Sequence, residues 1–180
     1  REKLGANQQI ADLIQALGCG SRTKYREEDL RYERVVIMTD ADVDGAHIAS
    51  LLITFFYQEM TDLVRKGHLF LAVPPLYRIT QGAKTLYARD DAHRAALVET
   101  EFSGRGKIEI GRFKGLGEMS PGQLKETTMD PASRTLLRVE IDEVDFEGTR
   151  DAVDALMGTK PEARFRFIQE RAVFADNLDI

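Results

Sequence analysis

The hydrophobic positions of residues 34–73 follow the order strand, helix, strand. The run from Arg34 to Thr39 is mostly apolar, as expected for a strand that is buried on both faces. Apolar side chains then recur at helical spacing up to Gly67, at Ile48, Leu51, Leu52, Phe55, Phe56, Met60, Leu63 and Val64. A second apolar run covers His68 to Val73. This order predicts a βαβ unit with two parallel strands and a right-handed crossover.

Shorter patterns predict the remaining elements. Gln9 to Leu17 has the apolar spacing of one helix face, and Gly18 is a plausible C-terminal stop. The polar stretch from Cys19 to Arg34 has no clear period and is expected to be a surface connection. The apolar segments around residues 81–84 predict a β-hairpin. The other expected elements are a helix at 90–99, strands at 107–113 and 136–141, and helices at 149–157 and 161–174.

These elements predict an α/β fold with two parts. Residues 1–80 would hold the parallel βαβ core, and residues 81–180 would form an α+β extension that contains the hairpin, a basic segment and two terminal helices. The 180-residue length, with 43% hydrophobic and 31% charged residues, is that of a soluble globular protein. No apolar run is long enough to span a bilayer and no signal-peptide pattern is present, so we expect a cytoplasmic protein without a membrane partner.

Cysteine and histidine usage narrows the chemistry. A single cysteine, Cys19, allows no internal disulfide and suits a reducing compartment. That cysteine and the scattered His47, His68 and His93 do not have the spacing of a Zn²⁺ site. The chain starts at Arg1 instead of methionine, so we expect it to be a fragment or a processed piece.

Charge is unevenly distributed on a chain of net charge −5. From Phe102 to Lys125 five basic residues stand against two acidic ones, whereas from Glu140 onward eleven acidic residues stand against five basic ones. A basic, glycine-rich segment is compatible with a nucleic-acid phosphate backbone as partner. Solvated surface charge remains the default interpretation of such a segment, and the charge pattern alone does not decide for nucleic acid.

Three carboxylates, Asp40, Asp42 and Asp44, follow the first predicted strand directly. Carboxylates this close repel one another unless a cation neutralises them. The carboxyl end of a strand is where open α/β sheets bind ligands. Mg²⁺ takes one or two carboxylates together with waters and phosphate oxygens. The pattern therefore predicts a magnesium site for phosphate chemistry.

The acidic cluster is also compatible with roles other than Mg²⁺ binding. An EF-hand loop is excluded because its twelfth position, which requires glutamate, is Leu51. An aspartyl-phosphate phosphotransferase with Asp40 as nucleophile remains open. An acidic turn with Asp44 as the helix N-cap is a purely structural alternative. It would account for Asp44 but not for Asp40 and Asp42.

A second motif lies between Arg112 and Pro121. Its two glycines, Gly115 and Gly117, would let the backbone approach a ligand closely. Ser120 followed by Pro121 predicts the start of a helix. A tight turn before that helix explains the glycines equally well.

Together these motifs carry a family resemblance. The segment 39–48 resembles the Asp-x-Asp motif of the Toprim domain in type IIA DNA topoisomerases. Segments 74–77, 112–119 and 126–131 resemble further signatures of the bacterial B subunits, in the same order. The resemblance covers nearly the whole chain. The hairpin region and residues 160–165 are closer to the topoisomerase IV branch than to the gyrase branch.

The resemblance implies a function and roles for individual residues. Asp40 and Asp42 match the metal-binding aspartates, whose Mg²⁺ assists attack on DNA by a tyrosine of the A subunit, and Asp44 matches a third acid that supports the site. Lys114 and Arg112 match a basic signature and are candidates for contacting duplex DNA. His47, one turn into the helix, could reach the loop or a phosphate, or could simply bond to backbone. In this family an A₂B₂ enzyme passes one duplex through another, and ATP is bound in a module outside this sequence.

One departure from the family pattern limits what this chain can do. The Glu-Gly-Asp-Ser-Ala motif on the first Toprim strand is absent, and its glutamate is the family's general acid/base. We therefore expect a partial Toprim core without its first strand, inactive alone, with the missing N-terminal part of the B subunit, the A subunit and DNA as partners. A gyrase-type B subunit and a catalytically silent scaffold for the A subunit are the alternatives. A Toprim primase or nuclease is disfavoured by segment 112–119.

Overall fold

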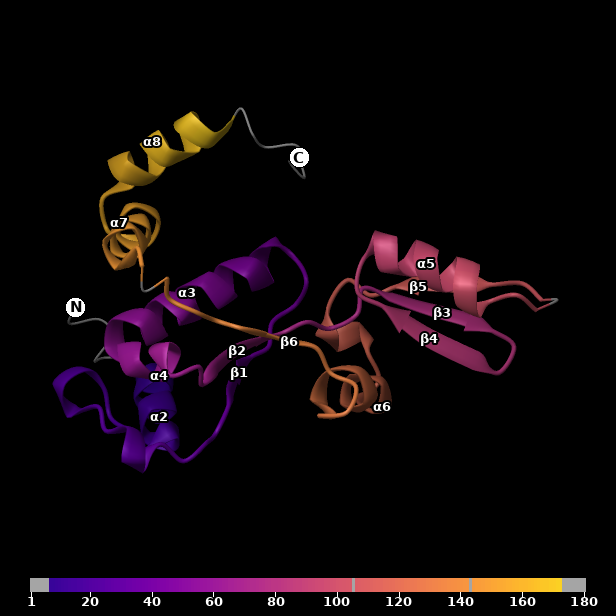
Figure 1. The fold of residues 1–180 in the computed structure, drawn as a ribbon, viewed down its shortest axis with the longest axis horizontal. Helices are drawn as coiled ribbons and strands as arrows, with labels where there is room; N and C mark the ends of the chain where they lie inside the picture. The colour runs from indigo at the N-terminus through magenta and orange to yellow at the C-terminus, as the bar shows by residue number, and fades with distance from the viewer. Residues whose placement is uncertain (1–6, 105, 143, 173–180) are drawn as a thin grey trace.

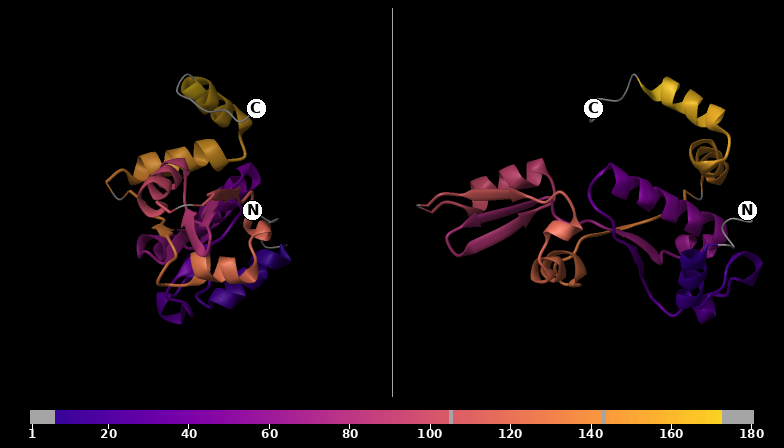
Figure 2. Two further views of the ribbon diagram at one scale, coloured as in Figure 1. Left: turned by 90° about the vertical axis from the view of Figure 1, so that its right-hand side faces the viewer. Right: turned by 180° about the vertical axis from the view of Figure 1, so that it is seen from behind.

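The computed structural model describes residues 7–104, 106–142 and 144–172. Figures 1 and 2 show an elongated molecule with a small sheet toward each end, joined by extended segments. One end holds the segments up to about residue 73 together with the last two helices, and the other holds a hairpin with a helix on it. The predicted turn at residues 103–106 includes Arg105, which lies outside the described residues, as do the last residues of the helix expected at 161–174.

The first sheet contains the predicted βαβ unit. Its strands, in spatial order, are β1 (Val35–Ile37), β2 (Leu69–Ala72) and β6 (Leu136–Arg138). β1 and β2 are parallel, with Val36 opposite Phe70, and α3 (Val43–Glu59) connects them. The prediction of parallel strands is confirmed. β6 adds to β2 in the antiparallel direction, with Leu71 opposite Leu137, a pairing that the sequence pattern did not predict.

Three of the described helices pack with this sheet, because their apolar side chains and those of the strands form one hydrophobic core. The helices are α2 (Gln8–Leu17), α3, and α4 (Thr61–Arg65). Phe56, Leu63 and Leu69 are at most 2% exposed and form the centre of this core. The helical spacing up to Gly67 belongs to two helices and not one, because the chain leaves helical geometry at Met60 (φ −143°), which is itself buried.

The segment from Cys19 to Arg34 is largely the surface connection that the sequence predicts, with an exception at Cys19. It contains two short 3₁₀ turns, η1 (Arg22–Lys24) and η2 (Glu27–Asp29), and most of it is exposed. Cys19, however, is 1% exposed and belongs to the core. Gly18 and Gly20 both have positive φ and turn the chain on either side of Cys19. A single buried residue between two turns has no periodicity, so sequence spacing does not reveal it.

The second sheet is antiparallel and contains the predicted hairpin. Its strands, in spatial order, are β4 (Lys84–Ala88), β3 (Tyr77–Gln81) and β5 (Glu109–Arg112). The hairpin turns at Gly82, whose φ is +59°. α5 (Asp91–Glu101) packs on the sheet over a small core in which Ile79 and Ala88 are fully buried. Residue 80 lies within β3, and the division of the chain there remains a prediction.

Short helical segments lie between β5 and β6 and so connect the two sheets, and two longer helices follow β6. α6 (Pro121–Leu124) begins with a capping box, since Ser120 and Gln123 each accept a hydrogen bond from the backbone amide of the other. The predicted helix start at Ser120 and Pro121 is confirmed. The remaining elements are η3 (Leu116–Glu118), the π-helical turn η4 (Lys125–Met129), α7 (Phe146–Met157) and α8 (Pro161–Arg171).

α7 packs against α3, with the Phe146 and Tyr57 rings 6.4 Å apart. α8 extends beyond α7, away from the sheet (Figure 2). In the described part of the chain, none of the helices has the length and apolar character needed to cross a membrane.

Candidate metal and nucleic-acid site

The acidic loop lies between the end of β1 and the start of α3. Asp42 is the N-cap of α3, because its backbone is extended and its Oδ1 accepts the Gly45 amide at 2.7 Å. The alternative with Asp44 as N-cap is therefore wrong. Asp44 already lies in the first helical turn, where a negative side chain is stabilised by the positive end of the helix dipole. Asp42 therefore has a structural role as the helix cap, whereas the Asp40 side chain does not cap the helix.

Asp40 instead contacts a segment that is 76 positions away in the sequence. Its Oδ1 accepts the backbone amide of Leu116 at 2.7 Å. Gly115 approaches so closely that a Cβ atom on it would lie 2.8 Å from Asp40 Cγ. Gly115 therefore allows its backbone to lie close to the Asp40 side chain, whereas the sequence analysis had considered a ligand or a tight turn as the reason for this glycine. The partner in that approach is the acidic loop.

A third motif, residues 74–77, is bonded to the segment that contacts Asp40. The Phe113 amide donates to the Leu76 carbonyl oxygen at 2.9 Å, and Tyr77 pairs with Arg112 between β3 and β5. Ala41, Pro75 and Leu116 then line one small recess between the segments. Three of the four motifs that were recognised separately thus form one structural unit at the carboxyl end of β1.

The predicted DNA-contacting residues lie on the same unit. Lys114 and Arg112 are both exposed, and no ion pair among the described residues uses either side chain. The loop around Lys114 is held by its own amide, which donates to Glu118 Oε2 at 2.8 Å. Two cationic side chains are therefore carried on the segment that binds Asp40, with their charges available to an anion.

His47 is exposed on the first turns of α3. Within the described ranges its side chain makes no hydrogen bond, to backbone or to the acidic loop. Its proposed contact with the loop or a phosphate stays a prediction.

The donor set suits a partly formed magnesium shell. Among the residues that the structure describes, no three His, Cys, Asp or Glu side chains gather closely enough to enclose a metal ion. Asp40 and Asp42 are exposed, and each has one oxygen bonded to a backbone amide. Mg²⁺ commonly takes one or two protein carboxylates and completes its shell with water and phosphate. Two oriented carboxylates fit that chemistry, whereas they are too few for a closed protein cage.

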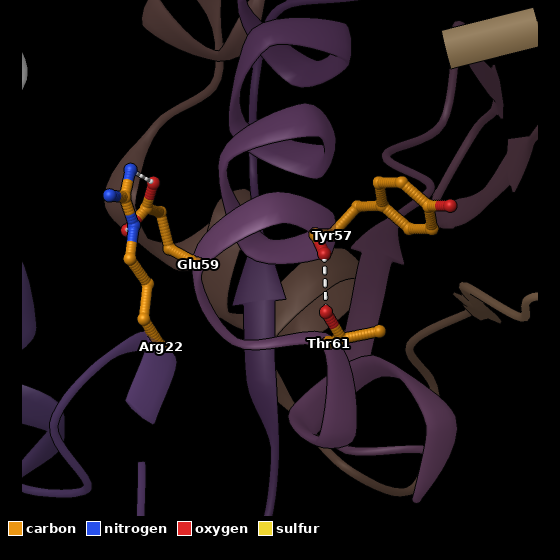
Figure 3. A network of polar contacts seen from close by, with 4 residues as sticks. All are labelled: Arg22, Tyr57, Glu59 and Thr61. Atoms are coloured by element: carbon orange, nitrogen blue, oxygen red, sulfur yellow. Dashed lines mark hydrogen bonds and ion pairs between the residues drawn. The ribbon is translucent and has the colours of Figure 1, made fainter. Parts of the chain in front are cut away.

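A second polar cluster, which the sequence patterns did not reveal, lies at the other end of α3. Figure 3 shows Glu59 bound by the guanidinium of Arg22, with Arg22 Nε 2.6 Å from Glu59 Oε2. Glu59 is only 8% exposed, and its hydrogen bond raises the pKa of Arg22. Beside it, Thr61 donates to the Tyr57 carbonyl oxygen where α3 ends. Nothing in the spacing of these residues signalled the pair.

A cavity of about 780 Å³ opens beside this cluster, between the end of α3 and α7. α3 is 17 residues long, so the cavity lies about 25 Å from the acidic loop. The Arg22–Glu59 pair anchors η1 to the core and is remote from the candidate site.

Comparison with known proteins defines the class. Residues 4–73 match the Toprim domain, and residues 105–169 match the carboxyl terminus of the DNA gyrase B subunit. The first match covers β1, α3 and β2, and the second covers the whole segment from Arg112 to Pro121, α6, α7 and most of α8. The chain belongs to the B subunits of bacterial type IIA DNA topoisomerases, in which a Toprim domain is followed by a gyrase-B-type carboxyl-terminal region.

Individual relatives agree with that class. The chain is 72% identical to the B subunit of DNA topoisomerase 4 from Bartonella bacilliformis over 100% of its length, and 64% identical to that from Caulobacter vibrioides over 99%. It is 47% identical to the B subunit of DNA gyrase from Metamycoplasma hominis over 97%. In each case it spans 26% of the relative. The predicted resemblance is confirmed, with topoisomerase 4 subunits more similar than this gyrase subunit.

Proposed function

We propose that this chain forms part of the DNA-cleavage centre of an ATP-dependent type II DNA topoisomerase that decatenates and relaxes chromosomal DNA in the cytoplasm. The observation that carries the proposal is the Asp40–Leu116 hydrogen bond. This bond joins the acidic loop to the segment from Arg112 to Pro121. Carboxylates that suit a metal and cations that suit a phosphate backbone therefore belong to one structural unit. The similarity to B subunits of DNA topoisomerase 4 supports the same assignment.

In this proposal Asp40 and Asp42 hold Mg²⁺, and Asp44 adds negative charge to the loop. The bound ion would stabilise the charge that develops on phosphate oxygens during strand cleavage and religation. Lys114 and Arg112 bind the DNA backbone and orient it against the acidic loop, and His47 is a further candidate for that contact. The backbone amides of Leu116 and Gly45 each bind one oxygen of these carboxylates and so restrict the orientation of the two side chains.

Other groups of the proposed reaction come from partners. The tyrosine that attacks DNA would belong to an A subunit, and the general acid/base glutamate and the ATP-binding module to the remainder of the B subunit. A catalytically silent scaffold is a second candidate, because the cap at Asp42 and the hydrogen bond at Asp40 each have a structural use. The two candidates differ in whether the charges of these carboxylates are needed.

The test replaces charge while keeping the hydrogen bonds. Asp40→Asn and Asp42→Asn retain a side-chain oxygen that can accept the Leu116 and Gly45 amides. Asp145→Asn is the matched control, since Asp145 caps α7 by accepting the Gly148 amide at 2.9 Å, as Asp42 does for α3. Each variant of the complete B subunit would be mixed with an A subunit, and Mg²⁺-dependent DNA cleavage and decatenation would be measured.

We expect both activities to be lost in the Asp40 and Asp42 variants and kept in the Asp145 control. Full activity in all three variants would show that the acidic loop serves only structure and would favour the scaffold. If the two loop variants also failed to bind the A subunit, measured in parallel, that loss would count against a role in metal binding.

A further inference from the structure

Asp40 is held between two glycines that come from distant parts of the chain. On its backbone side, a Cβ on Gly45 would overlap the Asp40 carbonyl oxygen and lie 2.8 Å from the carbonyl carbon. On its side-chain side, a Cβ on Gly115 would lie 2.9 Å from each carboxylate oxygen. These separations are shorter than real Cβ contacts. Asp40 therefore occupies a space that exists only because both neighbours lack side chains.

The glycine at position 115 is needed for space and not for backbone conformation. Its φ is −164° and its ψ is 175°, an extended conformation that every residue adopts. The nearby Gly117 differs, because a Cβ there would meet no atom within 4 Å. The loop thus contains one glycine that touches the candidate metal ligand and one that does not.

The Leu116 amide completes the contact. A backbone N–H that donates to an ionised carboxylate makes a charge-assisted hydrogen bond, stronger than one between neutral groups. Here it uses Oδ1 at 2.7 Å, and no donor among the described residues bonds to Oδ2. One oxygen of Asp40 is thereby fixed to the loop, which orients the other.

We propose that Gly115 and the Leu116 amide are positioning elements for Asp40. The inference rests on the proposed function, in which Asp40 binds the metal. Neither group touches the metal; they act through the orientation of the carboxylate.

The experiment compares Gly115→Ala with Gly117→Ala in the complete B subunit. Mg²⁺ and Mn²⁺ binding would be measured by titration calorimetry without nucleotide or DNA. Loss of a hydrogen-bonding partner behind a metal ligand typically weakens binding by about tenfold or more. We expect a weakening of about tenfold for Gly115→Ala, and no change for Gly117→Ala.

Two further measurements separate positioning from general damage to the fold. In a double variant, adding Gly115→Ala to Asp40→Ala should weaken metal binding no further, because the carboxylate that the new methyl group meets has gone. Hydrogen exchange at the Leu116 amide should be faster in Asp40→Ala and unchanged in Gly117→Ala. The exchange measurement on Asp40→Ala does not depend on whether Gly115→Ala folds.

The outcomes distinguish this inference from the proposed function. If Asp40→Ala binds metal as well as the unaltered protein, both are overturned. If Asp40→Ala weakens metal binding but Gly115→Ala does not, the positioning role is overturned and the proposed function stands. Additive losses in the double variant, or an unchanged exchange rate at Leu116 in Asp40→Ala, would likewise overturn the positioning role.

Discussion

Replacing Gly45 by alanine would test whether the acidic loop is packed as the structure places it. Gly45 is buried in the first turn of α3, and a Cβ there would overlap the Asp40 carbonyl oxygen and lie 2.8 Å from its carbonyl carbon. Both atoms are backbone, so no side-chain rotation relieves the overlap. The loop or the first turn of the helix has to move.

The expected magnitude follows from two opposing effects. Overpacking of a well-packed site costs about 1–3 kcal/mol, and a contact this short with immobile backbone belongs at the upper end of that range. Alanine in place of glycine in a helix gains up to about 1 kcal/mol. The net loss in the free energy of unfolding is therefore about 2 kcal/mol. In a chain of this size, that lowers Tm by roughly 4–8 °C.

Thermal unfolding followed by circular dichroism measures the change, with Gly122→Ala as the matched control. Gly122 also lies in the first turn of a helix, α6, but a Cβ there meets no atom within 4 Å. Its Tm should stay the same or rise. An unchanged Tm for Gly45→Ala would refute the close packing of α3 against the Asp40 backbone.

Three further changes test the core, the basic segment and a buried hydroxyl. Leu63→Ala removes a fully buried side chain and should cost about 2–5 kcal/mol in urea unfolding; a loss below about 1 kcal/mol, roughly the effect of a surface change, would contradict its central position. Lys114→Ala should weaken binding of duplex DNA and reduce the slope of log affinity against log salt by about one; an unaltered slope would remove Lys114 from the interface. Burial raises the pKa of Tyr25 from 10.0 to about 12. The unfolded chain therefore releases this proton first, so the stability due to Tyr25 is present below pH 10 and is lost as the pH rises toward 12. The Tyr25 hydroxyl has no hydrogen-bond partner among the described residues. Tyr25→Phe should therefore leave the free energy of unfolding unchanged at neutral pH, and in alkali the variant should lose less of it than the unaltered protein does. Identical alkaline profiles in urea titrations would contradict a buried hydroxyl.

The local elements of the fold were largely predictable because each leaves a pattern in neighbouring residues. The spacing of apolar side chains predicted α3 and the two parallel strands beside it. Gly18 at the end of α2 and the helix start at Ser120 and Pro121 were predictable because helix ends use particular residue types at fixed offsets. The N-cap at Asp42 was missed, since three alternating aspartates offer several equivalent caps. The backbone conformation of the loop decides between them.

The order of residues along the chain was enough to select the candidates for the chemistry: the aspartates after a buried strand, and the basic residues beside paired glycines. That these two motifs meet, through the contact of Asp40 with Gly115 and Leu116, follows from the folded arrangement alone. Loops have no periodicity, and a contact over 76 positions depends on how β5 pairs with β3 and how the linking segments fold back. The same reason explains why the pairing of β6 with β2 and the Arg22–Glu59 pair escaped prediction: their partners are chosen by the packing of distant elements.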